Sequence, residues 1–441
     1  MEHAMSESKS PFATEPVGGL IVKFAIPCVI SLVVNALYNI VDQIFIGWGV
    51  GYLGNGATNI VFPITIITLA LAVLVGDGGA AYLSLKLGEG DMASLKKGVG
   101  NSVVMVTIAG IALLVITLVF MDPILTLFGA TDALRPYAEE YGYVIAIGLP
   151  FTMISTALNA MIRADGSPKF AMFSMVLGAV INTIFDPIFI FALGMGVRGA
   201  AIATVMGQVA SFVVSVLYLP RFKTCHLDRS AFRLHLRVCK NVLSLGVSSF
   251  ITQIAITIVM TLFNNLLAIY GAESIYGAEI PLTAMGIVMK VNQIMLSILV
   301  GIAVGAQPVI GFNYGCKNFD RVKKAFELAI FAAEVIAVIA FLIFEFAVMC
   351  FRIFLMLCPL NGFQTVTAIY LQAIGKPVKS AIVTLARQIV FLIPAALILP
   401  QMMGVTGVLW SGPVADALAF ILALSFVLYD RKQLKKVPVQ E

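Results

Sequence analysis

Charged residues are scarce in this chain. They make up 12% of its 441 residues, whereas hydrophobic residues make up 60%, and the mean hydropathy is +1.01. Soluble globular domains usually contain about 25% charged residues. The composition therefore argues against an ordinary soluble domain and indicates an integral membrane protein.

Histidine and cysteine are also few. The three histidines lie in the leader or in a polar stretch in the middle of the chain: His3, His226 and His235. The six cysteines are scattered without a CxxC pair: Cys28, Cys225, Cys239, Cys316, Cys350 and Cys358. This pattern argues against a zinc site, a disulfide framework and a histidine proton relay within the membrane.

Motifs of the common enzyme classes are missing. The sequence has no GxxxxGK[ST], HExxH or GxSxG, and AIGKPVKS is not a phosphate loop because Pro377 follows the lysine. It also has no basic patch interleaved with aromatic residues on a soluble domain. We therefore expect no enzyme, no cofactor, no nucleic-acid partner, and no direct use of ATP unless a partner supplies it.

Long apolar runs fill most of the chain, and each is long enough to cross about 30 Å of hydrocarbon as a helix. They lie at residues 18–46, 57–87, 99–121, 137–163, 169–192, 198–219, 242–270, 281–310, 325–350, 353–374, 378–400 and 404–429. The first run is longer than a signal-peptide core and has no basic leader with a cleavage site, so we treat it as a retained helix. The sequence predicts an all-α membrane protein with twelve transmembrane helices.

Lysine and arginine gather in alternate connections between these runs. Most of the 28 lie at residues 96–97, 163–169, 221–240, 317–324, 376–379 and 431–436. The opposite connections carry little more than Arg135 and Arg198. The positive-inside rule then predicts a multi-pass protein of the cytoplasmic membrane with both termini in the cytoplasm. The net charge of +5 reflects this topology and anionic lipid headgroups. We expect lipid neighbours and a monomer.

A polar, basic stretch at residues 220–241 divides the chain into two halves, and segments of one half resemble segments of the other. LSLKLGEGDMASLKKG (residues 83–98) resembles VIGFNYGCKNFDRVKKA (residues 309–325), and IRADGSPK (residues 162–169) resembles LQAIGKPVK (residues 371–379). We predict a six-helix lobe at 1–219, a basic cytoplasmic linker at 220–241 and a second six-helix lobe at 242–441. Parallel repeats of this kind are related by a pseudo-two-fold axis along the membrane normal and commonly serve a central cleft with alternating access.

The second half is shorter than the first between its third and fourth helices. FEFAVMCFRIFLMLCPL runs from one predicted helix into the next without a turn signal, whereas the first half has a polar connection at 121–141. Two membrane helices cannot reverse direction without connecting residues. We therefore expect that a loop is missing near Cys350 and Phe351.

A carboxylate lies within the first apolar run. In NALYNIVDQIFIG (residues 35–47), Asn35, Tyr38 and Asp42 recur at helical spacing and so share one face with Ser31. For Ser31 and Asn35, hydrogen bonds between helices are an equal alternative. A charged side chain near the bilayer centre costs about 2.5 to 3.5 kcal/mol, so an acid there is a functional hypothesis by default.

A second carboxylate lies in the fifth run. NTIFDPIF places Asn182 and Asp186 on one face, and Pro187 cannot donate to the carbonyl of Thr183. Thr204 in the sixth run offers a hydroxyl. Two acids that face each other in a low dielectric repel, so either one of them binds a proton or a cation lies between them.

These segments resemble the multidrug and toxic compound extrusion (MATE) family. The resemblance rests on PCVISLVVNALYNIVDQIFIG, GFNYGCKN, IRADGSPK, LQAIGKP and FDPIFIFALGMGVRGAAIATVMGQ, in that duplicated order over essentially the whole chain. It implies a secondary antiporter that expels small organic cations or amphipaths in exchange for H+ or Na+.

The resemblance also implies a coupling site. Members with an acidic site in the N-terminal lobe share a pattern that Tyr38, Asp42, Asn182, Asp186 and Thr204 match, and it implies a proton or Na+ site there. Pro27 matches a first-helix proline that is proposed as a hinge, although a static proline is an equal alternative. Another branch uses an acid in the seventh helix, which here has no carboxylate before Glu273.

Apolar, adaptable side chains indicate the character of a substrate cavity. The 19 Met and 30 Phe would permit a repackable wall that accepts many substrates. The candidate wall residues are Asn35, Met153, Asn159, Met172, Met175, Lys290 and Gln293.

A flippase for lipid-linked saccharides, from the same superfamily, is the alternative function. It should place several basic residues in the cleft, and only Lys290 and Arg387 lie at membrane depth. A receptor or channel is a further alternative, but paired halves with a carboxylate cluster favour a carrier.

Overall fold

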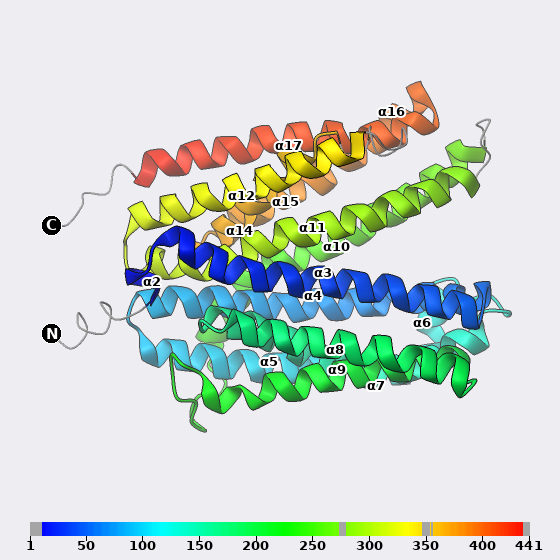
Figure 1. Cartoon of the computed structure of the whole chain (residues 1–441), viewed down its shortest axis with the longest axis horizontal. Coiled ribbons are helices and arrows are strands. Elements are labelled where there is room, and N and C mark those ends of the chain that lie inside the picture. Colours follow the sequence, from blue (N-terminus) through cyan, green and yellow to red (C-terminus); the bar gives the residue numbers. More distant parts are fainter. Residues whose placement is uncertain (1–10, 273–278, 346–352, 354–355, 435–441) are drawn as a thin grey trace. The chain divides into compact units, whose positions relative to one another are not determined.

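The computed structural model describes residues 11–272, 279–345, 353 and 356–434. These residues form helices, turns and short loops, with no strand among them (Figure 1). The loop expected near Cys350 and Phe351 lies outside the described residues.

Ten helical segments of the described chain are long and apolar enough to cross a membrane. They are α3 (Val17–Gly49), α4 (Tyr52–Gly88), α5 (Met92–Val119), α7 (Arg135–Ala164), α8 (Pro168–Pro187) with the π-helix η1 (Ile188–Ala192), α9 (Gly196–Leu217), α10 (Leu236–Ala272), α11 (Glu279–Gly315), α15 (Pro377–Leu385) with the π-helix η3 (Ala386–Leu392) and α16 (Ile393–Met403), and α17 (Val405–Leu434). The remaining two predicted runs coincide with α12 (Phe319–Glu345) and α14 (Cys358–Ala373). All twelve predicted runs are therefore helical where the structure describes them, and the predicted fold class is confirmed.

The chain forms two compact units. One unit consists of Met1–Val29 together with Ile251–Glu441, and the other consists of Ile30–Phe250. Both boundaries fall inside long helices, α3 and α10, rather than in a loop. The division into repeated lobes at 1–219 and 242–441 concerns sequence similarity and stays a prediction.

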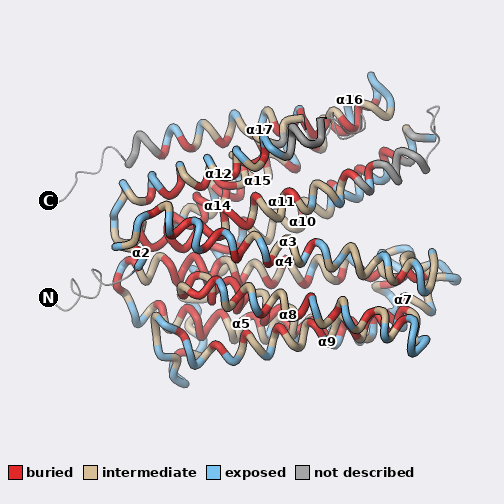
Figure 2. The backbone as a smooth tube through the Cα atoms, in the orientation of Figure 1, coloured by how far each residue is buried: buried red, intermediate tan, exposed pale blue. Residues whose placement is uncertain are grey.

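Hydrophobic clusters hold the unit Ile30–Phe250 together, and two of them are large. One cluster joins α4, α5, α7 and the segment after α9 through side chains such as Leu83, Val99, Leu158 and Phe222. The second includes Val61, Met121, Ile145 and Ala200 and joins α4, the short helix α6 (Met121–Leu127), α7 and α9. Figure 2 draws these buried residues in red. Within the hydrocarbon region such clusters stabilise the bundle by close van der Waals packing of their side chains.

The polar stretch after α9 is fixed to the same unit. The Asn101 amide donates to the carbonyls of Ala231 and Arg233, at 3.1 and 3.0 Å, and its oxygen accepts from the backbone of His235 at 2.7 Å. The Lys96 ammonium lies 2.7 Å from Asp228 and lowers the pKa of that exposed carboxyl to about 2. The predicted linker is therefore an ordered part of this unit where it contacts α5.

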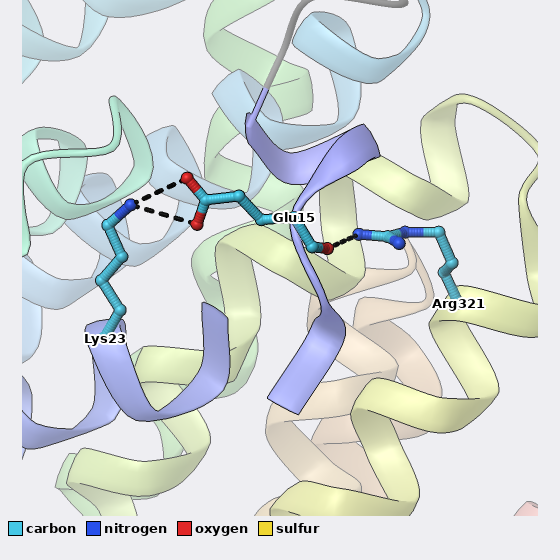
Figure 3. Close-up of polar contacts among 3 residues, drawn as sticks. All are labelled: Glu15, Lys23 and Arg321. Atoms are coloured by element: carbon cyan, nitrogen blue, oxygen red, sulfur yellow. Dashed lines mark hydrogen bonds and ion pairs between the residues drawn. The ribbon is translucent and has the colours of Figure 1, made fainter. Parts of the chain in front are cut away.

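A strap at the N-terminus belongs to the other unit. It consists of the short helix α2 (Pro11–Thr14) and Glu15. The Arg321 guanidinium donates to the carbonyls of Phe12 and Glu15, at 2.8 and 2.7 Å, and Asn313 also donates to Phe12. Figure 3 shows the Glu15 contact of Arg321 and the exposed ion pair of Glu15 with Lys23. A cation at the carbonyl end of a helical turn satisfies acceptors that have no partner within the helix.

We expect Arg321→Leu to release this strap. Each hydrogen bond from a charged group contributes about 1.5 to 3 kcal/mol, so the loss of two should open a four-residue helix that has little stability of its own. Hydrogen exchange of the amides at residues 12–15 should become faster, while α11 and α12 keep their protection. Lys23→Leu is the matched control, because its exposed ion pair contributes only about 0 to 1 kcal/mol. Equal exchange in both variants would contradict the role given to Arg321.

Candidate functional site

The first part of the site comes from α3. Tyr38 and Asp42 are partly buried, and Asp42 Oδ1 is a buried oxygen with no hydrogen-bond partner among the described residues. Asn35, one turn before Tyr38, is exposed, and its backbone carbonyl accepts from Asn39 at 2.7 Å. The polar face predicted for this helix therefore runs from an exposed amide to a buried carboxyl.

The second part comes from α8 and α9. Asn182 and Asp186 are buried, with 2% and 0% exposure. The Asn182 amide donates to Asp186 Oδ1 at 3.3 Å and to Thr204 Oγ1 at 3.1 Å. The two helices can approach closely because a Cβ atom on Gly207 would lie 2.4 Å from the carbonyl oxygen of Gly178. Side chains at these glycines would push Asn182 and Thr204 apart.

The backbone of α8 changes directly after Asp186. Pro187 has no N–H to donate, and the chain continues from it into the π-helix η1. The amide of Leu193 then donates to the carbonyl of Ile188 at 2.9 Å. Short π-helical turns occur frequently at functional sites. The buried carboxyl of Asp186 is thus carried at the point where the regular helix ends.

The structure brings the two acids together. The Asp42 carboxyl lies within hydrogen-bonding reach of Asp186 and of Asn182. Three buried oxygens of this group have no donor among the described residues: Asp42 Oδ1, Asn182 Oδ1 and Asp186 Oδ2. A buried acceptor without a donor costs about 1 to 3 kcal/mol, so the group is complete only with a further donor or a cation.

The chemistry of this donor set fits either a proton or a small hard cation. Carboxylate, amide and hydroxyl oxygens are the ligands that such cations prefer. Asp42, Asn182, Asp186 and Thr204 would hold the cation. Within the described part of the chain, no group of three or more His, Cys, Asp or Glu side chains could hold a metal ion.

Tyr141 is a site residue that the sequence did not reveal. It lies on α7, is buried, and is within electrostatic reach of Asp42, Asp186 and Tyr38. Its only signal in the sequence is a polar hydroxyl near the start of an apolar run, where a tyrosine is more often a residue of the membrane interface.

The residues predicted for a substrate wall are divided between the two units. Met153 is fully buried in the hydrophobic cluster of α4, α5 and α7, and Asn159 is buried with its oxygen 3.4 Å from the Ser215 hydroxyl. Met172 and Met175 are partly exposed on α8. Lys290 and Gln293 are exposed on α11 in the other unit. Pro27, the predicted hinge, lies inside α3 and also belongs to that unit. The substrate wall and the hinge stay predictions.

Comparisons with known proteins agree with the fold and with the sequence motifs. The family model MatE matches residues 27–188 and 249–398. "Multidrug export protein MepA" of Staphylococcus aureus (strain N315) is 25% identical over 442 residues, which cover 96% of both chains. The protein of the same name from Staphylococcus haemolyticus (strain JCSC1435) is 26% identical over 430 residues, which cover 92% of both chains.

Solved structures are similar over nearly the whole chain. One is described as the outward-facing conformation of a multidrug resistance MATE family transporter of the MOP superfamily; its TM-score is 0.89 at 24% identity, over 97% of this chain and 98% of that one. A crystal structure of MATE in complex with MaD3S has a TM-score of 0.90 at 24% identity, over 97% and 99% of the two chains. At this identity the likeness shows the fold alone.

Proposed function

Because the chain belongs to the MatE family of membrane transporters, we propose that it is a secondary multidrug efflux antiporter. It expels small cationic or amphipathic organic compounds in exchange for H+ or Na+. The export activity named for the MepA relatives supports this substrate class. The protein acts as a monomer in the cytoplasmic membrane, with both termini in the cytoplasm.

One observation carries the proposal, namely the pair of Asp42 and Asp186 with Asn182 beside it, where three buried oxygens lack a donor in the described structure. Two carboxylates in a low dielectric repel each other, and either a proton or a cation relieves that repulsion. Asn182 donates to both Asp186 and Thr204 and so fixes the geometry of the pair. The pair therefore binds a positively charged occupant that can be exchanged, whereas a fixed salt bridge would hold a permanent charge.

Antiport follows if ion and substrate use the same negative charge. A coupling ion at the pair removes the charge that attracts a cationic substrate, so the two would occupy the site at different stages of the cycle. A carrier that switches between its inward-open and outward-open states only when the pair is neutralised would exchange the coupling ion for the substrate. This is alternating access driven by differential binding to two states.

The flippase alternative is less well supported. Such a carrier needs free basic groups in its cleft, but Arg387 donates to Asp416 at 2.7 Å. Its charge is therefore already neutralised by a partner. Of the two basic residues considered for this role, Lys290 remains.

Purified protein in proteoliposomes tests the antiporter. A pH gradient and a sodium gradient are imposed separately, and the efflux of a fluorescent cationic dye is followed. We expect one of these gradients to drive dye movement against its own concentration gradient without ATP. If neither gradient moves the dye, the antiporter proposal is wrong.

A further inference from the structure

A row of polar residues follows one face of α9 beyond the carboxyl pair. We call Thr204, Gln208, Ser211, Ser215 and Tyr218 the α9 polar row. Their spacing alternates between four and three residues, which places them on a single face. The row lies wholly in the unit Ile30–Phe250, so its contacts are those of one compact body.

The first member joins the row to the carboxyl pair. Thr204 Oγ1 accepts from the Asn182 amide at 3.1 Å, and the same amide donates to Asp186 at 3.3 Å. The pair and the row therefore share one hydrogen-bonded connection through Asn182.

The middle of the row is a cluster of hydroxyl groups between α7, α8 and α9. The Ser174 hydroxyl of α8 lies 3.0 Å from the Ser211 hydroxyl and 2.9 Å from the Ser215 hydroxyl. Ser215 donates to Asn159 of α7 at 3.4 Å. These four residues are all buried. A hydroxyl can donate and accept at once, which is what the transfer of a proton from group to group requires.

The row ends at a buried carboxylate outside the membrane-spanning helices. The Tyr218 hydroxyl lies 2.7 Å from Asp165 and 2.7 Å from Ser167, in the turn between α7 and α8. Asp165 also accepts from the backbone amides of Lys223 and Thr224, at 2.8 and 2.9 Å, and from the Thr224 hydroxyl at 2.6 Å. This end carries the basic segment that the charge distribution places in the cytoplasm.

Burial raises the pKa of Asp165, while the hydrogen bonds that it accepts from residues 218–224 oppose this rise. The other titratable groups that face it are Tyr218 and Cys225, and Lys96 is within electrostatic reach of Cys225. Burial, together with the Asp165 charge, raises the pKa of the Cys225 thiol to about 11. Asp165 is therefore the carboxyl at this end of the row whose protonated form is favoured by burial.

Gln208 occupies the gap between Thr204 and the hydroxyl cluster. Its Oε1 is buried and has no hydrogen-bond partner among the residues that the structure describes. A Cβ atom on Gly148 would lie 2.1 Å from this oxygen, so a glycine on α7 makes room for it. A buried amide oxygen needs a donor, and a water molecule is the usual donor where protein groups provide none.

We propose that the α9 polar row, with Asn182, Ser174 and Asn159, is a proton path between the Asp42–Asp186 pair and Asp165. The inference rests on the proposed antiport and deepens it, since it assigns H+ as the coupling ion. Hydrogen bonds that serve only to join helices would be closed within the protein. The open acceptor of Gln208, between the Asn182–Thr204 hydrogen bond and the hydroxyl cluster, favours a hydrated path instead.

The transfer balances in charge and in protons. A carboxyl O–H of the pair breaks and leaves a carboxylate behind. A water beside Asn182 takes this proton and passes one to the Thr204 hydroxyl, while the Asn182 and Asn159 amides only hold the neighbouring groups in place. Along the row each hydroxyl or water then forms one O–H bond as it loses another, with water also bridging at Gln208 and between Ser215 and Tyr218. Asp165 takes up the last proton and releases it to the water at the linker surface. No redox step is involved.

Gln208→Leu tests the path in proteoliposomes that contain a trapped pH indicator. Leucine fills a similar volume but removes the amide, so we expect proton release coupled to dye efflux to slow by about tenfold, the effect of roughly 1.4 kcal/mol on a barrier. The dye dissociation constant should change little. The slowdown in deuterium oxide should be larger than in the wild type, because proton transfer becomes limiting. A purely structural residue would not change this isotope effect.

Ser84→Ala is the matched control, because Ser84 is a buried serine of α4 whose hydroxyl donates to its own helix, at 2.9 Å from the Ala80 carbonyl. It should retain wild-type proton release. Ser215→Ala is the second path variant, since it removes a single atom and should fold where Gln208→Leu does not. Wild-type proton release in both path variants would overturn the path. Dye efflux driven by sodium and not by pH would also overturn it, yet would leave the antiporter intact.

Discussion

Asp42→Asn should reduce gradient-driven dye efflux by at least about a hundredfold, because it removes a group that acts in the transport step itself. Asparagine has nearly the shape of aspartate but cannot carry the charge that a proton or cation neutralises. Asp186 would then stand alone beside Asn182, and the repulsion that favours an occupant would be absent. The measurement is initial efflux from proteoliposomes under each imposed gradient, with the amount of folded protein determined by size-exclusion chromatography.

Asp122→Asn is the control for this substitution. Asp122 pairs with Arg135 at the surface of α6 and is largely exposed, so the same chemical change there should leave efflux unchanged. Full efflux in Asp42→Asn would show that the site is wrongly assigned. Efflux retained in Asp186→Asn but lost in Asp42→Asn would instead reduce α8 to a scaffold and keep the coupling on α3.

The sequence predicted the helices of this site but not the whole site. Helical spacing gave the shared face of Tyr38 and Asp42 and that of Asn182 and Asp186, because spacing along one helix fixes which side chains point the same way. It could not give Tyr141, because that residue reaches Asp42 only through the packing of α7 against the other helices. Periodicity defines a face, whereas tertiary packing decides what the face meets.

The sequence also did not predict where some helices end or which apolar residues are buried. The apolar run predicted at 242–270 belongs to α10, which begins at Leu236, because a helix can continue past the membrane through polar residues such as Lys240 and Asn241. Met153 was a candidate for a substrate wall, yet it is fully buried. In a membrane protein apolar side chains face lipid, core or cavity alike, so composition does not distinguish these positions.

We expect the ion pair of Arg387 and Asp416 to stabilise the fold rather than to act in dye efflux, in contrast to the carboxyl pair. It joins η3 to α17, with Arg387 Nε 2.7 Å from Asp416 Oδ1, and the Asp416 side chain is only 5% exposed. Removal of one partner leaves a buried charge without compensation, which costs about 3 to 5 kcal/mol. Asp416→Leu should therefore lower the unfolding temperature in detergent strongly.

The double variant Arg387→Met with Asp416→Leu should recover most of that loss, because replacing both charges with apolar groups is often nearly neutral. A double-mutant cycle on unfolding temperatures measures this coupling, and the exposed pair Lys23 and Glu15 provides a weak reference. A closed pair of opposite charges has no need of a mobile ion, unlike Asp42 and Asp186. If Asp416→Leu kept its stability but lost dye efflux, Asp416 would instead belong to the transport machinery, and the exchange of ions could not be assigned to the unit Ile30–Phe250 alone.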